Sequence, residues 1–180
     1  MTRTLMHPMA ADTARNNRHF QLIVDVHLLL LSDGDLLLGR RANTGYGDGA
    51  YEPPSDRLAE RETLVEAAVR VAGAQVGIEL DAGRVSLAHV MHDVSGSGRI
   101  AFFLTVTGWQ GEFISPDARW FGIGDLPTNM LDRSRVALRN YAGGLRFSTY
   151  PAFGPAGTGG GPALYGTLHE AAPWQDAFSA

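Results

Sequence analysis

The chain has 180 residues, of which 44% are hydrophobic, and a formal net charge of −4 at pH 7. This length suits one compact domain with a core and is short for two. The negative net charge and the absence of any Lys/Arg run argue against a nucleic-acid polymer as a partner, because such polymers are held by neutralising their phosphates. We therefore expect one domain with tails and no grip on DNA or RNA.

No cysteine occurs in the sequence. Disulfides, thiolate metal sites and cysteine nucleophiles are thereby excluded. The first 20 residues contain no apolar run of the length that a signal peptide needs, and no 18-residue apolar span follows. We expect a cytoplasmic protein that does not enter a membrane.

Two strand-like segments begin the domain. Residues 20–31 are rich in β-forming residues, the turn sequence SDGD follows, and a second apolar run leads to Arg40 and Arg41. The two runs and the turn between them predict a hairpin. The Gly- and Pro-rich residues 41–55 predict a loop that a ligand can contact. Apolar residues then recur at helical spacing from Glu62 to Val76, and Gly77 is typical of the residue that ends a helix.

The second half of the domain repeats this strand pattern. Residues 85–94 and 99–111 predict a hairpin through the turn SGSG, a short strand begins at Ala118, and residues 129–143 predict an amphipathic helix. These elements predict an α/β fold, an α/β/α sandwich around a mixed sheet, over residues 20–150. Residues 1–19 are an N-terminal extension, and residues 151–180 are a Gly/Pro/Ala-rich tail with little apolar surface to bury.

The loop and helix resemble the Nudix signature, G-x5-E-x7-R-E-U-x-E-E-x-G-U, in which U is an aliphatic residue. Gly49, Ala50 and Tyr51 resemble the approach to the signature, Glu62 falls on its first glutamate, and Arg70 on its arginine. Gly77 and Ile78 match the closing pair without a gap. Further segments from Leu22 to Tyr150 are similar to one bacterial subgroup of Nudix hydrolases. The resemblance implies the Nudix fold.

The departures from the signature fall on its chemistry. The resemblance implies hydrolysis of a nucleoside diphosphate linked to another group, with Mg²⁺ or Mn²⁺ held by glutamates at positions that are here Val71, Ala74 and Gln75. Hard divalent cations need oxygen ligands, preferably carboxylates. We therefore expect no metal cofactor, and we interpret the helix as a structural remnant whose cleft face has become apolar.

The acidic residues around the start of the helix leave two interpretations open. One is a rebuilt site for Mg²⁺ or Mn²⁺ made of Asp56, Glu60, Glu62 and Glu66. The other is a charged surface on which these acids pair with Arg57, Arg61 and Arg70. Under the first interpretation, the chain is an atypical hydrolase with a displaced metal site.

Asp25 and His27 are the leading candidates for metal-free acid–base chemistry. They alternate with Val24, Val26 and Leu28, so the pair points away from the apolar face of its strand. An aspartate can orient a histidine ring and raise its basicity. The alternative, which the pattern favours, is that His27 is a hydrogen-bonded residue of the sheet. Glu62 or Glu66 could supply a further acid.

Four residues are candidates for ligand binding. Arg40 and Arg41 end a strand beside the loop, where a guanidinium can bind phosphate or carboxylate, although two solvated arginines are an alternative. Tyr46 can stack on a planar ligand, whereas Tyr51 is more typical of core packing. His89 and His92 lie three residues apart in one predicted strand, so their side chains point to opposite faces and at most one of them faces the cleft.

Three functional hypotheses follow. The first is a repurposed small-molecule enzyme of the isomerase, cyclase or lyase type, and the second is a non-catalytic domain that binds a nucleotide-like ligand. The third is the atypical hydrolase. Each takes a small molecule as its substrate or ligand. A homodimer through the apolar outer face of the strand that contains residues 102–104 is consistent with all three.

Overall fold

The computed structural model describes residues 21–151, so the expected N-terminal extension (residues 1–19) and the tail from residue 152 lie outside the described residues. The longer strands are β1 (Ile23–Ser32), β2 (Asp35–Arg40), β6 (Val85–Asp93), β7 (Arg99–Val106), β9 (Ala118–Gly122) and β10 (Phe147–Tyr150). The short strands are β3 (Tyr51–Glu52), β4 (Ser55–Arg57), β5 (Glu79–Leu80) and β8 (Trp109–Gln110). The helices are α1 (Leu64–Val71), α2 (Asp132–Ala142), a π-helix (Ala72–Val76) and a 3₁₀ turn (Ala82–Arg84).

The main sheet is mixed and has eight strands, with the path β10-β6-β7-β1-β2-β3. Strand β1 runs parallel to β7, and β10 runs parallel to β6, whereas the other pairs are antiparallel. Both predicted hairpins, β1-β2 and β6-β7, are present. The strand β4, which follows the loop, pairs with β1 and brings the loop against the centre of the sheet.

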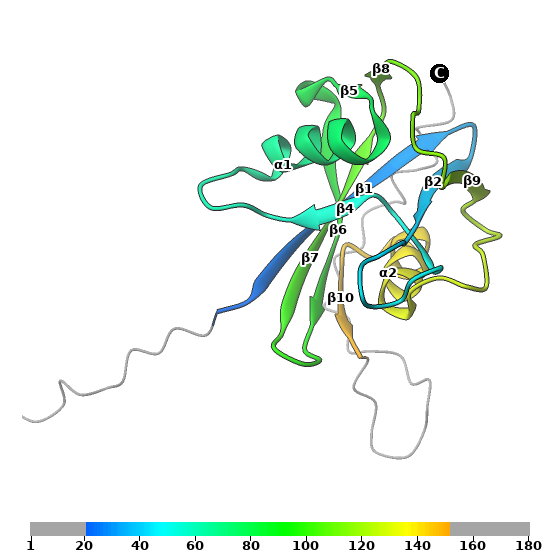
Figure 1. The fold of residues 1–180 in the computed structure, drawn as a ribbon. Helices are drawn as coiled ribbons and strands as arrows, with labels where there is room; N and C mark the ends of the chain where they lie inside the picture. The colour runs from blue at the N-terminus through cyan, green and yellow to red at the C-terminus, as the bar shows by residue number, and fades with distance from the viewer. Residues whose placement is uncertain (1–20, 152–180) are drawn as a thin grey trace, which may run out of the picture.

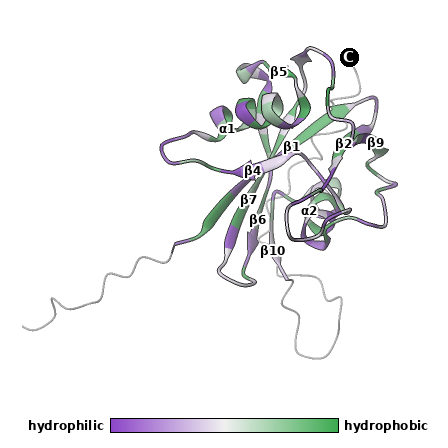
Figure 2. Ribbon diagram, viewed as in Figure 1, coloured by the Kyte–Doolittle hydropathy of each residue, from purple (hydrophilic) through white to green (hydrophobic). Residues whose placement is uncertain are grey.

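One helix covers each face of the sheet, which confirms the expected α/β/α sandwich (Figure 1). On the α1 side, Ala67, Ala68 and Val71 pack against alternate residues of β1 in one core cluster. On the α2 side, Leu138 and Tyr141 pack in a second cluster that includes Phe103. The central strands are accordingly largely apolar in Figure 2. No helix within residues 21–151 is long and apolar enough to cross a lipid bilayer.

Both faces of β1 are buried, which corrects part of the sequence interpretation. Val26 and Leu28 face the α1 cluster, and Asp25 and His27 lie on the opposite face as expected. However, only 8% of Asp25 and 3% of His27 is exposed, because Arg99 pairs with Asp25 and the ring of Phe103 stacks on His27. A polar pair within a sheet buried on both faces is costly unless it finds partners.

The helix α1 begins later and ends differently than predicted. Thr63 is its N-cap and forms a capping box with Glu66, so the helix starts two residues after Glu62. Its last turn widens into the π-helix, and Gly77 then ends the run with φ of 80°. A glycine suits this left-handed conformation because it has no Cβ. A π-bulge of this kind is frequent at functional sites.

Candidate functional site

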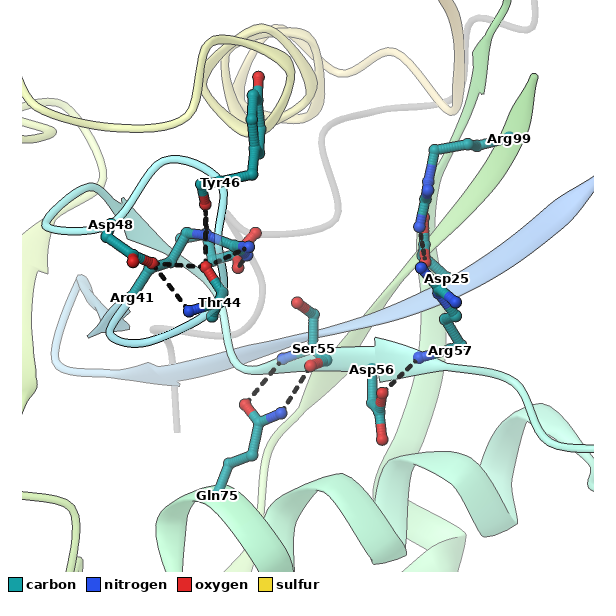
Figure 3. A network of polar contacts seen from close by, with 11 residues as sticks. Asp25, Arg41, Thr44, Tyr46, Asp48, Ser55, Asp56, Arg57, Gln75 and Arg99 are labelled. Carbon is teal, nitrogen blue, oxygen red and sulfur yellow. Dashed lines mark hydrogen bonds and ion pairs between the residues drawn. The ribbon is translucent and has the colours of Figure 1, made fainter. Parts of the chain in front are cut away.

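Arg41 organises the Gly-rich loop after β2. Its Nε donates to the carbonyl of Tyr46 (3.0 Å), its Nη2 donates to the hydroxyl of Thr44 (3.0 Å), and its Nη1 contacts Glu52. Asp48 accepts from the hydroxyl and amide of Thr44, and these bonds lower the pKa of Asp48. Figure 3 shows Arg41, Thr44 and Asp48 converging. One guanidinium thus joins both ends of the loop to the residues within it.

The loop separates two neighbouring cavities that share Arg41, Thr44, Glu52 and Ser55. The first, of about 290 Å³, we call the loop cavity; its other lining residues include Arg40, Gln75 and Asp117. The second, of about 380 Å³, we call the arginine cavity. Beyond the shared four residues, it is lined by Asp25, His27, Tyr46, Asp56, Arg57, Arg99 and Arg133. Both volumes are of the size that small-molecule sites have.

The segment before α2 is hydrogen-bonded to β3, and Arg133 at the start of α2 lines the arginine cavity. The amide of Tyr51 donates to the carbonyl of Asn129 (2.8 Å), and the amide of Leu131 donates back to the carbonyl of Tyr51 (3.1 Å). The guanidinium of Arg133 then lies 6.0 Å from the centroid of the Tyr46 ring. Tyr51 itself packs edge-on against Phe121 in the α2 cluster, as the sequence favoured.

Asp25 is committed to Arg99. Its two carboxylate oxygens accept from Nε and Nη2 of Arg99 at 2.5 and 2.6 Å, a bidentate pair between β1 and β7. The hydrogen bonds to Asp25 are the main reason that the pKa of Arg99 is raised. No hydrogen bond joins Asp25 to His27, whose Nδ1 has no partner within the described residues. The predicted acid–histidine dyad is therefore adjacent along β1 but not assembled.

His27 is a buried, neutral histidine. Its ring stacks on Phe103, with centroids 4.5 Å apart and an interplanar angle of 11°. Burial lowers the pKa of His27 to about 4, the charge of Asp25 opposes this, and Arg133, Arg99 and Arg41 add to it. Its Nδ1 is buried and has no hydrogen-bond partner within the described residues. At neutral pH the ring is uncharged and has an unused nitrogen.

Glu52 is a site residue that the sequence analysis missed, as it missed Arg99 and Arg133. One carboxylate oxygen contacts Arg41, whereas Oε2 is buried and without a partner among residues 21–151. Burial raises the pKa of Glu52, although the charge and hydrogen bond of Arg41 oppose the effect. The sequence did contain a signal, since Glu52 is an acid placed between an aromatic core residue and two prolines, with Arg41 eleven residues earlier.

The acids before α1 converge on Arg70. Glu62 accepts from Nε and Nη2 of Arg70 at 2.7 and 2.9 Å, and Asp56 accepts from Nη1 at 2.6 Å. These bonds, with one from the amide of Ala59, lower the pKa of Glu62 to about 2. Glu66 instead accepts from the amide and hydroxyl of Thr63 at 2.8 Å in the capping box. Of these three acids, only Asp56 lines either of the two cavities.

The helix positions that correspond to signature glutamates behave differently from one another. Val71 is 1% exposed and packs in the α1 core cluster. The expectation that it faces the cleft is therefore wrong. Ala74 is exposed and lines neither of the two cavities. Gln75 lines the loop cavity, where its Nε2 donates to the carbonyl of Ser55 (2.6 Å) and its Oε1 accepts from the amide of Ser55 (3.1 Å). Of these three positions, only Gln75 therefore faces a cavity, and it does so with a polar side chain.

These side chains do not fit a divalent cation. Asp56 and Glu62 both accept hydrogen bonds from the guanidinium of Arg70, and Glu66 caps the helix. Both groups of the Gln75 amide are hydrogen-bonded to Ser55. Across residues 21–151, no group of three or more His, Asp or Glu side chains is arranged to hold a metal ion. A hard cation needs several free oxygen ligands, which this arrangement does not offer.

The remaining predicted ligand-binding residues divide into two kinds. Arg40 lines the loop cavity, with its Nε 3.3 Å from the carbonyl of Gly49, and Tyr46 is 65% exposed at the arginine cavity. His89 is fully buried, and its ring nitrogens lie 2.7 Å from the carbonyl of Leu145 and 2.8 Å from the hydroxyl of Ser148. Burial lowers the pKa of His89. In this position it joins β6 to the chain before β10 and lines neither cavity.

Comparison with solved structures shows the same fold in several proteins. A MutT NUDIX hydrolase from Burkholderia pseudomallei is similar over 66% of this chain and 97% of its own, with 25% sequence identity and a TM-score of 0.56. The E. coli ORF135 protein matches over 69% and 91%, with 19% identity and a TM-score of 0.57. A MutT protein from Methanosarcina mazei Go1 matches over 68% and 94%, with 18% identity and a TM-score of 0.55. No protein-family model and no curated protein sequence matches the chain.

Proposed function

Because the chain belongs to the Nudix superfamily, we propose that its cleft binds a small molecule without a divalent metal ion and has lost diphosphate hydrolysis. The observation that carries the proposal is the pairing of Gln75 with Ser55. Gln75 stands where the signature has its last metal-binding glutamate, and both groups of its amide are bonded to one backbone residue. A neutral amide used in this way leaves no ligand for a cation at that position.

The charge around α1 supports the same proposal. In a metal-dependent site, carboxylates converge so that the cation neutralises them. Here the guanidinium of Arg70 already bonds to Asp56 and Glu62. A rebuilt metal site from these two acids would have to displace Arg70, which also donates to the carbonyl of Arg57 (2.9 Å).

A titration of Mg²⁺ and Mn²⁺ into the full chain, with a phosphate-release screen over nucleoside diphosphate derivatives, tests the proposal. We expect no saturable metal binding and no product that EDTA suppresses. The matched variants are Asp56→Asn and Glu62→Gln, with Glu60→Gln as the control, because Glu60 is 89% exposed and pairs only with Arg61 among the described residues. EDTA-sensitive release that is lost in Asp56→Asn but kept in Glu60→Gln would overturn the proposal and restore the hydrolase.

Metal-free acid–base turnover is the second candidate function. It is favoured by two buried polar atoms without partners among residues 21–151, Nδ1 of His27 and Oε2 of Glu52, whose side chains line the same cavity. The neutral imidazole and the carboxyl of raised pKa could exchange a proton with a substrate. Asp25 has no part in this scheme, because Arg99 holds it.

Product analysis by mass spectrometry with a library of small phosphorylated and carboxylated compounds distinguishes binding from turnover. Turnover that survives EDTA and falls by at least about a hundredfold in His27→Gln or Glu52→Gln would support the enzyme. Binding without any product would support a non-catalytic module. Turnover that is unchanged in both variants would exclude this acid–base pair.

A further inference from the structure

The arginine cavity has more positive than negative charge left after its internal pairs are formed. Four arginines and three acids line it. Arg99 is neutralised by Asp25 and Arg41 by Glu52, while Asp56 bonds to Arg70, which is not among the lining residues. Arg57 and Arg133 have no carboxylate partner within residues 21–151. Two positive charges therefore remain in one small cavity.

Arg133 acts on the inside of this cavity. It lines the cavity together with His27 and Glu52, and its positive charge helps to lower the pKa of His27 and opposes the rise in the pKa of Glu52. Arg57 lines the same cavity from β4. Its Cα partner on the neighbouring strand β1 is Asp25. Two arginines from separate elements that converge on one cavity are well placed to bind one anion.

The floor of the cavity also contains unused hydrogen-bonding capacity. Both His27 and Glu52 are more than nine-tenths buried, and each has one nitrogen or oxygen atom without a partner in the part of the chain that the structure describes. Leaving such an atom unpaired costs about 1 to 3 kcal/mol, so it points to a group that a ligand supplies. This observation is independent of the charge balance.

Tyr46 supplies an apolar surface at the mouth. It is 65% exposed, lies on the loop that Arg41 holds in place, and its ring faces α2 near Arg133 (Figure 3). An exposed ring on an ordered loop can stack against a planar group. The cavity thus offers cations, buried polar atoms and one aromatic face.

We propose that the arginine cavity binds a small phosphomonoester that contains a planar ring, with Arg57 and Arg133 on the phosphate, Tyr46 on the ring, and His27 and Glu52 on its polar substituents. The inference rests on the proposed function, since the phosphate is bound by arginines and not through a metal ion. Dianionic phosphate is the anion that two forked guanidinium groups bind best.

Calorimetric titration in EDTA with three probes tests the inference: inorganic phosphate, phenyl phosphate and benzoate. We expect phenyl phosphate to bind about threefold more tightly than inorganic phosphate because of stacking on Tyr46, and benzoate to bind more weakly than either. Arg133→Ala and Arg57→Ala should each lower the affinity for inorganic phosphate and for phenyl phosphate by roughly tenfold or more. Arg139→Ala is the matched control, because Arg139 is an exposed arginine on the same helix α2 and lines neither cavity.

The outcomes separate the inference from the proposed function. Tyr46→Ala should remove the preference for phenyl phosphate and leave the affinity for inorganic phosphate unchanged. No binding of any phosphate, with or without Mg²⁺, would overturn the subsite and leave metal-free function standing. Phosphate binding that requires Mg²⁺ would overturn both. Equal losses of phosphate affinity in Arg133→Ala and Arg139→Ala would show that only the net charge of the protein matters, and would also overturn the subsite.

Discussion

The two sides of the cleft differ in whether their charged and polar side chains have partners. On the α1 side, Asp56, Glu62 and Arg70 are partly exposed and satisfy one another, and Glu66 caps the helix. On the α2 side, His27 and Glu52 are buried with unpaired atoms, and Arg133 has no acid to bind among the described residues. The charged groups around α1 thus satisfy one another, whereas the α2 side has the buried, unsatisfied groups typical of a binding site.

This comparison predicts that substitutions on the α2 side cost more stability than those on the α1 side. Arg99→Ala should have the largest effect, because it leaves the carboxylate of Asp25 buried without its partner. We expect a loss of about 3 to 4 kcal/mol in the free energy of unfolding, measured by urea denaturation. Arg84→Ala, which removes an exposed pair with Asp81, should cost less than about 1 kcal/mol. Similar costs for the two variants would contradict the distinction.

Burial of His27 predicts the next largest effect, a dependence of stability on pH. The pKa of His27 is about 4 in the folded chain, whereas an unperturbed histidine has a pKa of 6.5, so the unfolded chain binds the additional proton between these values. Stability from this group is therefore complete above pH 6.5 and falls as the pH decreases toward 4. Comparison of the unfolding free energies at pH 7 and pH 4 should give a loss of about 3 kcal/mol beyond that of His27→Phe. Parallel pH profiles for the two proteins would exclude this account.

The capping box on the α1 side should contribute less. Thr63→Ala removes the hydroxyl that accepts from the amide of Glu66, and we expect a loss of about 1 kcal/mol in the free energy of unfolding. Thr63→Ser, which keeps the hydroxyl, should restore most of it. A loss in Thr63→Ser equal to that in Thr63→Ala would show that packing of the methyl group, and not the cap, is responsible.

The smallest effect is expected at Gln75. Its two bonds to Ser55 are solvent-exposed, so Gln75→Ala should cost about 0.5 to 1 kcal/mol. Gln75→Glu removes the donor to the carbonyl of Ser55, and calorimetry should show no gain of Mg²⁺ binding, because Asp56 and Glu62 stay with Arg70. Tight Mg²⁺ binding in Gln75→Glu would show that one substitution suffices to open the α1 side.

Most of the fold follows from the sequence because its signals are local. The alternation in β1, the turn residues of both hairpins and the helical period before Gly77 each act within a few residues, and all correspond to observed elements. The same local rules did not reveal the π-helical last turn, because Val71 and Val76 are drawn into the core on the same side of the sheet. Helix boundaries are set by such packing as much as by propensity.

By itself, the sequence determined the Nudix fold and the absence of carboxylates at Val71, Ala74 and Gln75, since both depend on residue identity and spacing. Only the tertiary structure decided which charges meet. Asp25 and Arg99 are separated by 74 residues, and their pairing depends on the register of β1 against β7. His27 is likewise buried against the ring of Phe103, and Glu52 is buried beside Arg41, eleven residues earlier in the chain. Long-range register and burial fix these contacts, and no local pattern encodes either.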